Sequence, residues 1–124
     1  MAERESLTFT GRLRSLRWAW RGIRVMLASQ HNAWLHAVAS VIVVAAGLML
    51  RLSVAEWCWI VLAAMAVWTA EALNTAIEFL TDVASPQFHP TAGKAKDVAA
   101  GAVLLTAIGA VIIGALVFGP HVVG

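Results

Sequence analysis

The chain has 124 residues, enough for one domain, and 60% of them are apolar whereas 13% are charged. Since the charged fraction is about half that of an average soluble domain, the composition indicates an integral membrane protein and excludes an ordinary soluble enzyme. The single cysteine excludes a disulfide framework and a cysteine-based metal site. The net charge of +2 is small, but six of the nine basic residues lie near the start: Arg4, Arg12, Arg14, Arg17, Arg21 and Arg24.

Residues 7–28 have the pattern of an amphipathic helix. The apolar residues recur at spacings of three and four, and the arginines form a neighbouring stripe; the apolar stripe is Leu13, Leu16, Trp20, Ile23 and Leu27. Tryptophan and arginine side chains suit a helix that lies in the membrane interface. The alternative is a cytoplasmic helix that packs against protein. Beside membrane spans, the basic patch favours anionic headgroups or a nucleotide as its partner.

Three membrane spans are expected after this helix, at about 33–50, 55–81 and 98–118. Each is long enough to cross about 30 Å of hydrocarbon. Residues 52–54 predict a very short turn, and residues 83–95, with their prolines and glycine, predict a longer loop. The excess of basic residues in the N-terminal segment and in this loop predicts that both face the cytoplasm. In the third span a small-residue stripe, Ala102, Thr106, Ala110 and Gly114, predicts a seam between helices or subunits.

The second span carries an unusual polar stripe. With a helical step of about 100°, Glu71, Asn74, Glu78 and Asp82 fall within about 80° of one another. Burial of one unpaired carboxylate near lipid costs at least about 2–3 kcal/mol, so this stripe needs a partner, and a metal ion is the obvious candidate. The alternative is a polar cluster that is satisfied between subunits. Asp82 is interpreted equally well as a catalytic group or as a solvated carboxylate at a helix end.

Carboxylates, an asparagine, two lysines and an arginine-rich helix at one interface suit Mg²⁺ and phosphate. Mg²⁺ usually takes one or two carboxylates together with substrate phosphates, and phosphoryl transfer depends on positioning and charge neutralisation. The sequence contains neither a GxxxxGK[ST] loop nor the glycine-rich loop of protein kinases. His36, within the first span, is expected to be a packed histidine rather than a ligand.

Two segments resemble the conserved blocks of the bacterial diacylglycerol kinase and undecaprenol kinase family. The first is Glu71-Ala-Leu-Asn74-Thr-Ala-Ile-Glu78 with Asp82 after it, and the second is Gly93-Lys-Ala-Lys96-Asp97-Val-Ala-Ala-Gly-Ala-Val103. The resemblance covers about residues 9–118. It implies an all-α integral membrane protein of the bacterial inner membrane, with a surface helix and three spans, assembled as a homotrimer with active sites between subunits at the cytoplasmic side.

The same resemblance implies a lipid kinase that transfers the γ-phosphoryl group of MgATP to a long-chain lipid alcohol. The family label favours diacylglycerol, giving phosphatidic acid; undecaprenol, giving undecaprenyl phosphate, is the alternative. A small channel or ion-coupled transporter subunit is the alternative of another class, because intramembrane carboxylates often mark proton paths. The lack of charge from Trp57 to Ala70 in the second span and throughout the third disfavours it. A non-catalytic assembly protein would leave the second block unexplained.

Site residues follow from the resemblance position by position. Glu71 matches the catalytic base beside the lipid substrate, Asn74 a conserved active-site amide, and Glu78 a metal-binding carboxylate. Gln30 stands where the family often has a second metal-binding glutamate. Arg12 is the expected phosphate or substrate contact near the N-terminus. The residues expected around ATP are Trp18, Gln30, Glu78, Gln87, His89, Lys96 and Asp97.

Overall fold

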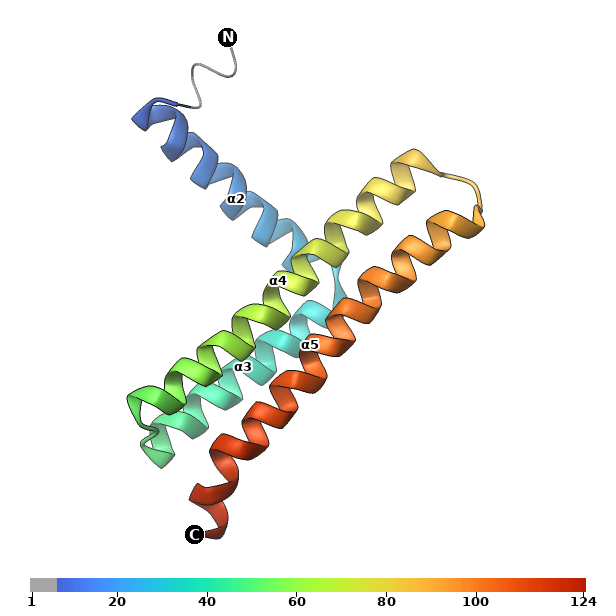
Figure 1. Ribbon diagram of the computed structural model, residues 1–124. Coiled ribbons are helices and arrows are strands. Elements are labelled where there is room, and N and C mark those ends of the chain that lie inside the picture. Colours follow the sequence, from blue (N-terminus) through green and yellow to red (C-terminus); the bar gives the residue numbers. More distant parts are fainter. Residues whose placement is uncertain (1–6) are drawn as a thin grey trace. The chain divides into compact units, whose positions relative to one another are not determined.

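The computed structural model describes residues 7–124, in which the regular elements are all α-helices (Figure 1). They are α2 (Phe9–Ser29), α3 (His31–Leu50), α4 (Val54–Ala84) and α5 (Pro90–Val123). The expected all-α class is therefore confirmed. The chain divides into two units, Met1–His31 and Asn32–Gly124, which are described separately. Arg4, one of the clustered basic residues, lies outside the described residues.

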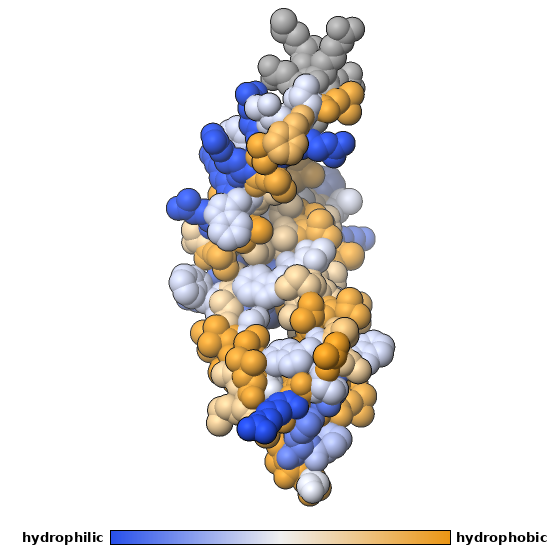
Figure 2. Space-filling view, turned by 90° about the vertical axis from the view of Figure 1, so that its left-hand side faces the viewer, coloured by the Kyte–Doolittle hydropathy of each residue, from blue (hydrophilic) through white to orange (hydrophobic). Residues whose placement is uncertain are grey.

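Helix α2 is amphipathic. Its first turn is capped by Thr8, whose hydroxyl oxygen accepts a hydrogen bond from the Gly11 amide at 3.1 Å, which satisfies one of the free N–H groups that every helix start leaves. The apolar stripe of this helix is exposed, with Leu13 52% and Leu16 66% accessible. Figure 2 shows hydrophilic side chains beside hydrophobic ones in the part of the surface that adjoins the grey N-terminal residues. Such a helix needs an apolar partner for one of its faces.

A tight hairpin joins α3 to α4. The amide of Leu52 donates to the carbonyl of Gly47 at 3.1 Å, and Arg51 between them has a φ of 55°. This is the geometry of a Schellman cap, in which the residue after the helix adopts the left-handed conformation. Ser53 then begins α4 with a capping box, because its hydroxyl accepts from the Glu56 amide while the Glu56 carboxylate accepts from the Ser53 amide.

The connection between α4 and α5 is shorter than the sequence predicts. Residues 83–95 were expected to form a loop, but α4 extends to Ala84 and α5 already begins at Pro90. The reason is that proline at the first position of a helix sacrifices no hydrogen bond. His89 provides the cap, since its Nδ1 accepts from the Thr91 amide at 3.1 Å. Pro90 therefore starts a helix instead of interrupting one.

Helices α4 and α5 run antiparallel and pack against each other along their length, with α3 beside them (Figure 1). The apolar core lies near the hairpin end of the unit, where Leu52, Ile60 and Val117 are buried together and Trp57 packs on them. Elsewhere most large apolar side chains of α3 and α5 are exposed. By length and composition, all three helices are able to cross a membrane, where lipid or protein covers such side chains.

Candidate active site

The polar stripe on α4 changes from fully buried to exposed along the helix. Glu71 has no accessible surface and Asn74 is 6% exposed, whereas the side chain of Asp82, three turns later, is 63% exposed. Glu78 lies between these extremes and is half-buried. The four side chains share one helix face, so the face leads from the interior of the helix bundle to its surface.

The Glu71 carboxylate lacks hydrogen bonds within residues 7–124. Both of its oxygens are buried without a hydrogen-bond partner in this part of the chain. A positively ionisable group, His36 on α3, lies close by, with its Nε2 3.6 Å from Glu71 Oε2, just beyond hydrogen-bonding distance. Buried carboxylates are normally hydrogen-bonded, and leaving one unpaired costs several kcal/mol. An unpaired carboxylate at such a depth makes Glu71 a candidate functional group.

Glu71 lines a cavity of about 280 Å³ between α3, α4 and α5. Apart from Glu71, its polar lining consists of three side chains, Asn32, His36 and Asn74. The other lining residues are apolar: Leu35, Ala100, Val103, Leu104 and Ala107. A small alcohol group with an apolar tail suits this combination of a carboxylate, amides and aliphatic walls.

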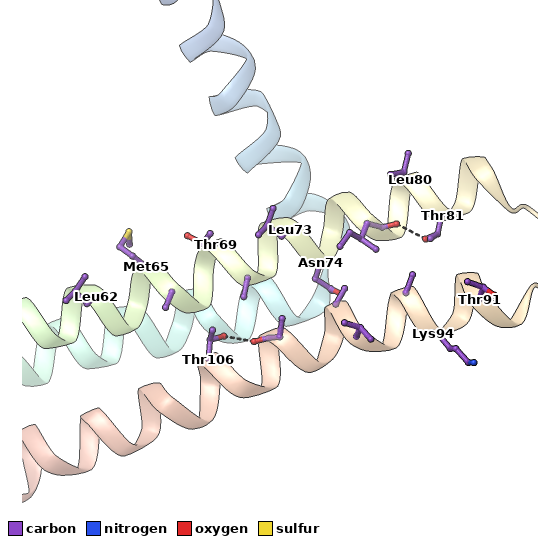
Figure 3. A pocket seen from close by; sticks show the side chains of 17 residues that line it. Leu62, Met65, Thr69, Leu73, Asn74, Leu80, Thr81, Thr91, Lys94 and Thr106 are labelled. Atoms are coloured by element: carbon purple, nitrogen blue, oxygen red, sulfur yellow. Dashed lines mark hydrogen bonds between the residues drawn. The ribbon is translucent and has the colours of Figure 1, made fainter.

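Asn74 connects Glu71's cavity to Glu78. Its Nδ2 donates to Glu78 Oε1 at 3.4 Å, while its Oδ1 is buried without a partner in the described part of the chain. Figure 3 shows Asn74 pointing from α4 toward α5. The amide therefore orients one carboxylate, and its own oxygen has no donor within residues 7–124.

Asn74 also lines a long apolar groove of about 1130 Å³ between α4 and α5 (Figure 3). Its walls include Leu62, Met65 and Leu73 from α4 and Val98 from α5. Lys94 stands at the edge of the groove and points away from α4 in Figure 3. The groove is thus lined mainly by aliphatic side chains and carries one charged side chain, Lys94, at its edge.

A third, smaller pocket of about 230 Å³ lies at the loop between α4 and α5. It brings together Gln87, His89 and Lys96, three residues that the resemblance places around ATP. Lys96 Nζ forms an ion pair with Asp82 Oδ1 at 2.5 Å. Asp97 is exposed and does not line this pocket. The side chains of Lys96 and Asp97 therefore do not both face it.

The remaining expected site residues lie on α2 or at its end. Gln30 is the C-cap, and its amide donates to the Met26 carbonyl at 3.1 Å. Trp18 is exposed, with the Arg21 guanidinium carbon 5.4 Å from its ring centroid, a cation–π arrangement. Arg12 is exposed on the same helix. These residues belong to the first unit, so their relation to Glu71 and Glu78 stays a prediction.

The available ligands suit a magnesium ion that is held mainly by the phosphates of a bound nucleotide. Residues 7–124 contain no group of three or more His, Cys, Asp or Glu side chains placed to hold a metal. Glu78 offers one half-buried carboxylate, already oriented by Asn74. Mg²⁺ commonly binds through one or two carboxylates plus substrate phosphates and water, so Glu78 together with a bound nucleotide suffices for such a site.

Two contacts at the site were not predicted from the sequence. His36 was expected to be a packed histidine, and it lies beside Trp68, but its position 3.6 Å from Glu71 was not predicted. The sequence feature that could have indicated this contact is a titratable side chain in a span without formal charge. Asp82, interpreted as catalytic or solvated, is paired with Lys96. That pair joins residues on either side of the short loop, and its formation depends on α5 beginning at Pro90.

Comparison with known proteins places the chain in a family. The model of prokaryotic diacylglycerol kinase matches residues 17–118. The chain is 41% identical over 102 residues to an undecaprenol kinase of Bacillus subtilis, covering 82% of this chain and 83% of that one. It is 42% identical over 101 residues to a diacylglycerol kinase of Synechocystis, covering 81% of this chain and 58% of that protein.

A more distant relative covers more of the chain. A diacylglycerol kinase of Escherichia coli is 27% identical over 113 residues, which is 91% of this chain and 93% of that one. The match to the family model spans most of the described helices, including both conserved blocks around Glu71 and Lys96. The resemblance drawn from those blocks is confirmed, and the chain belongs to the prokaryotic diacylglycerol kinase family.

Proposed function

We propose that this protein is a membrane lipid kinase that transfers the γ-phosphoryl group of MgATP to a long-chain lipid alcohol. Membership of the family supports the kinase activity and the use of ATP. The observation that carries the proposed mechanism is the fully buried Glu71 carboxylate, unpaired within residues 7–124, which lines a cavity among membrane-spanning helices. The family name favours diacylglycerol as the lipid; the similarity to an undecaprenol kinase keeps undecaprenol as the alternative.

In the proposed reaction the lipid hydroxyl oxygen attacks the γ-phosphorus of ATP. The bond from that phosphorus to the β–γ bridging oxygen breaks, and ADP leaves. The hydroxyl proton passes to a carboxylate oxygen of Glu71. A general base must lie within hydrogen-bonding reach of the proton that it accepts, and it contributes about 10²–10⁴-fold to the rate. The lipid phosphate and ADP are the products, and Glu71 returns its proton to solvent.

The nucleotide is proposed to bind toward the exposed end of the stripe. Glu78, oriented by Asn74, would hold the magnesium ion with the ATP phosphates, and Gln30 is the proposed second ligand. When bound, the ion neutralises charge on the phosphates. Lys96 adds a positive charge at the same end. The proposed ATP contacts are completed by Trp18, Gln87, His89 and Asp97.

The lipid is proposed to approach from the bilayer. The groove between α4 and α5 has aliphatic walls that suit acyl or prenyl chains, and Asn74 lines both this groove and the cavity of Glu71. Arg12 is the proposed contact for the polar part of the lipid. The basic N-terminal segment and the lysines near the loop support a cytoplasmic position for the N-terminus and site, in the bacterial inner membrane, with α2 at the membrane surface.

A homotrimer is the proposed assembly. The small-residue stripe on α5 and the exposed apolar side chains of α3 and α5 support close helix contacts between copies. Crosslinking in mild detergent is expected to trap a ladder that ends at three subunits. An active enzyme that is strictly monomeric would contradict this assembly.

The activity is tested by incubating purified protein in lipid micelles with labelled ATP and either diacylglycerol or undecaprenol. Label is expected in a lipid phosphate, and the rates with the two alcohols decide the substrate. Triacylglycerol, which has no free hydroxyl, is the matched lipid control. A protein that labels neither alcohol, yet conducts ions in vesicles, would support the channel interpretation and overturn the kinase proposal.

A further inference from the structure

His36 on α3 is the one ionisable neighbour of Glu71 in their shared cavity. Its Nε2 lies 3.6 Å from Glu71 Oε2, and its side chain is 21% exposed. From α4 the cavity receives Glu71 and Asn74, from α3 it receives Asn32, Leu35 and His36, and α5 contributes aliphatic residues only. Among the residues that line this cavity, histidine and glutamate are thus the only two that titrate.

His36 lies beside a small network that includes Trp68 and Ser40. The Trp68 ring stands edge-on to the imidazole, with centroids 6.2 Å apart and planes at 67°. Trp68 Nε1 donates to Ser40 Oγ at 3.1 Å, and Ser40 Oγ in turn donates to the His36 carbonyl at 2.7 Å. Trp68 and Glu71 lie one turn apart on α4, so one helix both supports the imidazole and presents the carboxylate to it.

A carboxylate that serves as a general base has to be held in one orientation. Glu71 has two equivalent oxygens, and residues 7–124 give neither of them a hydrogen bond. His36 offers a ring N–H at a distance that needs to shorten by about half an ångström to form one. Hydrogen bonds of catalytic groups are often long before substrate binds and tighten in the complex.

We propose that His36 is a positioning residue for Glu71. Its Nε2–H donates to Glu71 Oε2, which leaves Oε1 to face the lipid hydroxyl and accept its proton. The imidazole keeps its own proton throughout. In this arrangement His36 orients the base Glu71, as a third group orients the base in many catalytic sites. This inference rests on the proposed function, in which Glu71 is the base, and adds a residue whose role neither the sequence pattern nor the family match assigns.

The test compares His36→Leu and His36→Gln with the full-length wild-type enzyme in lipid micelles. Leucine removes the N–H donor, and kcat is expected to fall about 10- to 100-fold, as for a misplaced catalytic group, while KM for ATP stays unchanged. Glutamine restores an N–H donor and is expected to recover most of the loss. A purely structural role would lower the amount of folded enzyme and would not distinguish glutamine from leucine in kcat.

His121→Leu is the matched control. It removes another histidine that pairs with a glutamate of α4, Glu56, but far from the proposed chemistry, and its kcat is expected to equal that of the wild type. If His36→Leu does not fold, Trp68→Phe takes its place, because it keeps an aromatic ring beside the imidazole while removing the donor to Ser40 together with one ring of the indole. A several-fold fall in kcat is then expected, and an unchanged kcat would overturn the proposal.

Combination with Glu71→Gln separates this inference from the proposed function. In the Glu71→Gln background, His36→Leu is expected to cause no further loss, because the two residues act as one unit. If His36→Leu turns over at the wild-type rate while Glu71→Gln is inactive, the positioning role of His36 is overturned and Glu71 remains the proposed base. An active Glu71→Gln would overturn the proposed mechanism itself.

Discussion

Two histidine–glutamate pairs involve α4, one at the start of the helix and one near its middle, and they differ in almost every respect. At the hairpin end Glu56 lies 2.5 Å from His121 Nε2 and also accepts the Ser53 amide, with 29% of its side chain exposed. In the middle of the helix Glu71 is fully buried, and His36 is 3.6 Å away. The first carboxylate is satisfied by the capping residue Ser53 and by His121 of α5, whereas the second has no hydrogen bond within residues 7–124.

The difference supports the proposal that Glu56 serves structure and Glu71 serves chemistry. Glu56 belongs to the start of its helix, where a negative charge is favourable, and its partners satisfy it. Burial of the Glu71 carboxylate without a hydrogen-bond partner costs several kcal/mol of folding free energy. Structures tolerate such a cost mainly at functional sites. The predictions below test this contrast, beginning with the largest expected effect.

Glu78→Gln is expected to abolish Mg²⁺-dependent turnover, with a loss of at least about 100-fold, and to leave the helices intact. The reason is that Glu78 is the best-oriented carboxylate for the ion at the proposed nucleotide end. The measurement is the rate against Mg²⁺ concentration, with circular dichroism as the check on folding. An unchanged Mg²⁺ dependence in the variant would remove Glu78 from the proposed metal site.

Gly47→Ala should damage the hairpin end and spare the chemistry. A Cβ at this position would lie 2.5 Å from Cη2 of Trp57, so overpacking is expected to lower the free energy of unfolding by about 1–3 kcal/mol. Thermal unfolding in detergent measures the effect, and the specific activity of the folded fraction should be normal. Gly109→Ala is the matched control, because a Cβ there meets nothing within 4 Å. Equal melting temperatures for both variants would refute the packing argument.

Asp82→Asn is expected to reduce turnover by less than tenfold, because Asp82 is exposed and its ion pair within residues 7–124 is with Lys96. Its side chain lies three turns from Glu71, about 16 Å along the axis, which is too far for both to reach one hydroxyl. ATP affinity is expected to change more than the rate of the chemical step. A complete loss of turnover would instead give Asp82 a direct catalytic role.

His121→Leu is expected to have the smallest effect, a loss of at most about 1 kcal/mol in stability, since the Glu56–His121 pair is partly exposed. Activity per folded molecule should stay at the wild-type level. Chemical unfolding and turnover of one preparation measure both quantities. If His121→Leu folds but is inactive, both histidine–glutamate pairs matter to the chemistry, and the proposed difference between Glu56 and Glu71 is wrong.

Much of the architecture and the polar stripe follows from the sequence, because both depend on helical periodicity. Uncharged stretches predict the helices, and the spacing of Glu71, Asn74 and Glu78 places them on one face. The loop was predicted too long because proline was interpreted as a helix breaker, although Pro90 occupies the first position of a helix, where it is favourable.

Contacts between helices did not follow from the sequence. His36 and Glu71 meet because of the register between α3 and α4, and this register is set by the Arg51 cap and by the packing of Gly47 against Trp57. No spacing along one helix contains that information. The roles of Trp18, Gln30 and Arg12 stay predictions for the same reason, since they depend on how α2 meets the other helices.

The most direct test compares Glu71→Gln with Glu56→Gln, two identical substitutions on the same helix. Lipid phosphorylation and ATP affinity are measured for both in the same lipid micelles. Glu71→Gln is expected to lose about 10²–10⁴-fold in turnover while still binding ATP, because Glu78, Lys96 and Asp97 remain. Glu56→Gln is expected to turn over at nearly the wild-type rate. A near-normal rate for Glu71→Gln, with either Glu56→Gln or Asp82→Asn inactive, would contradict the assignment of Glu71 as the base.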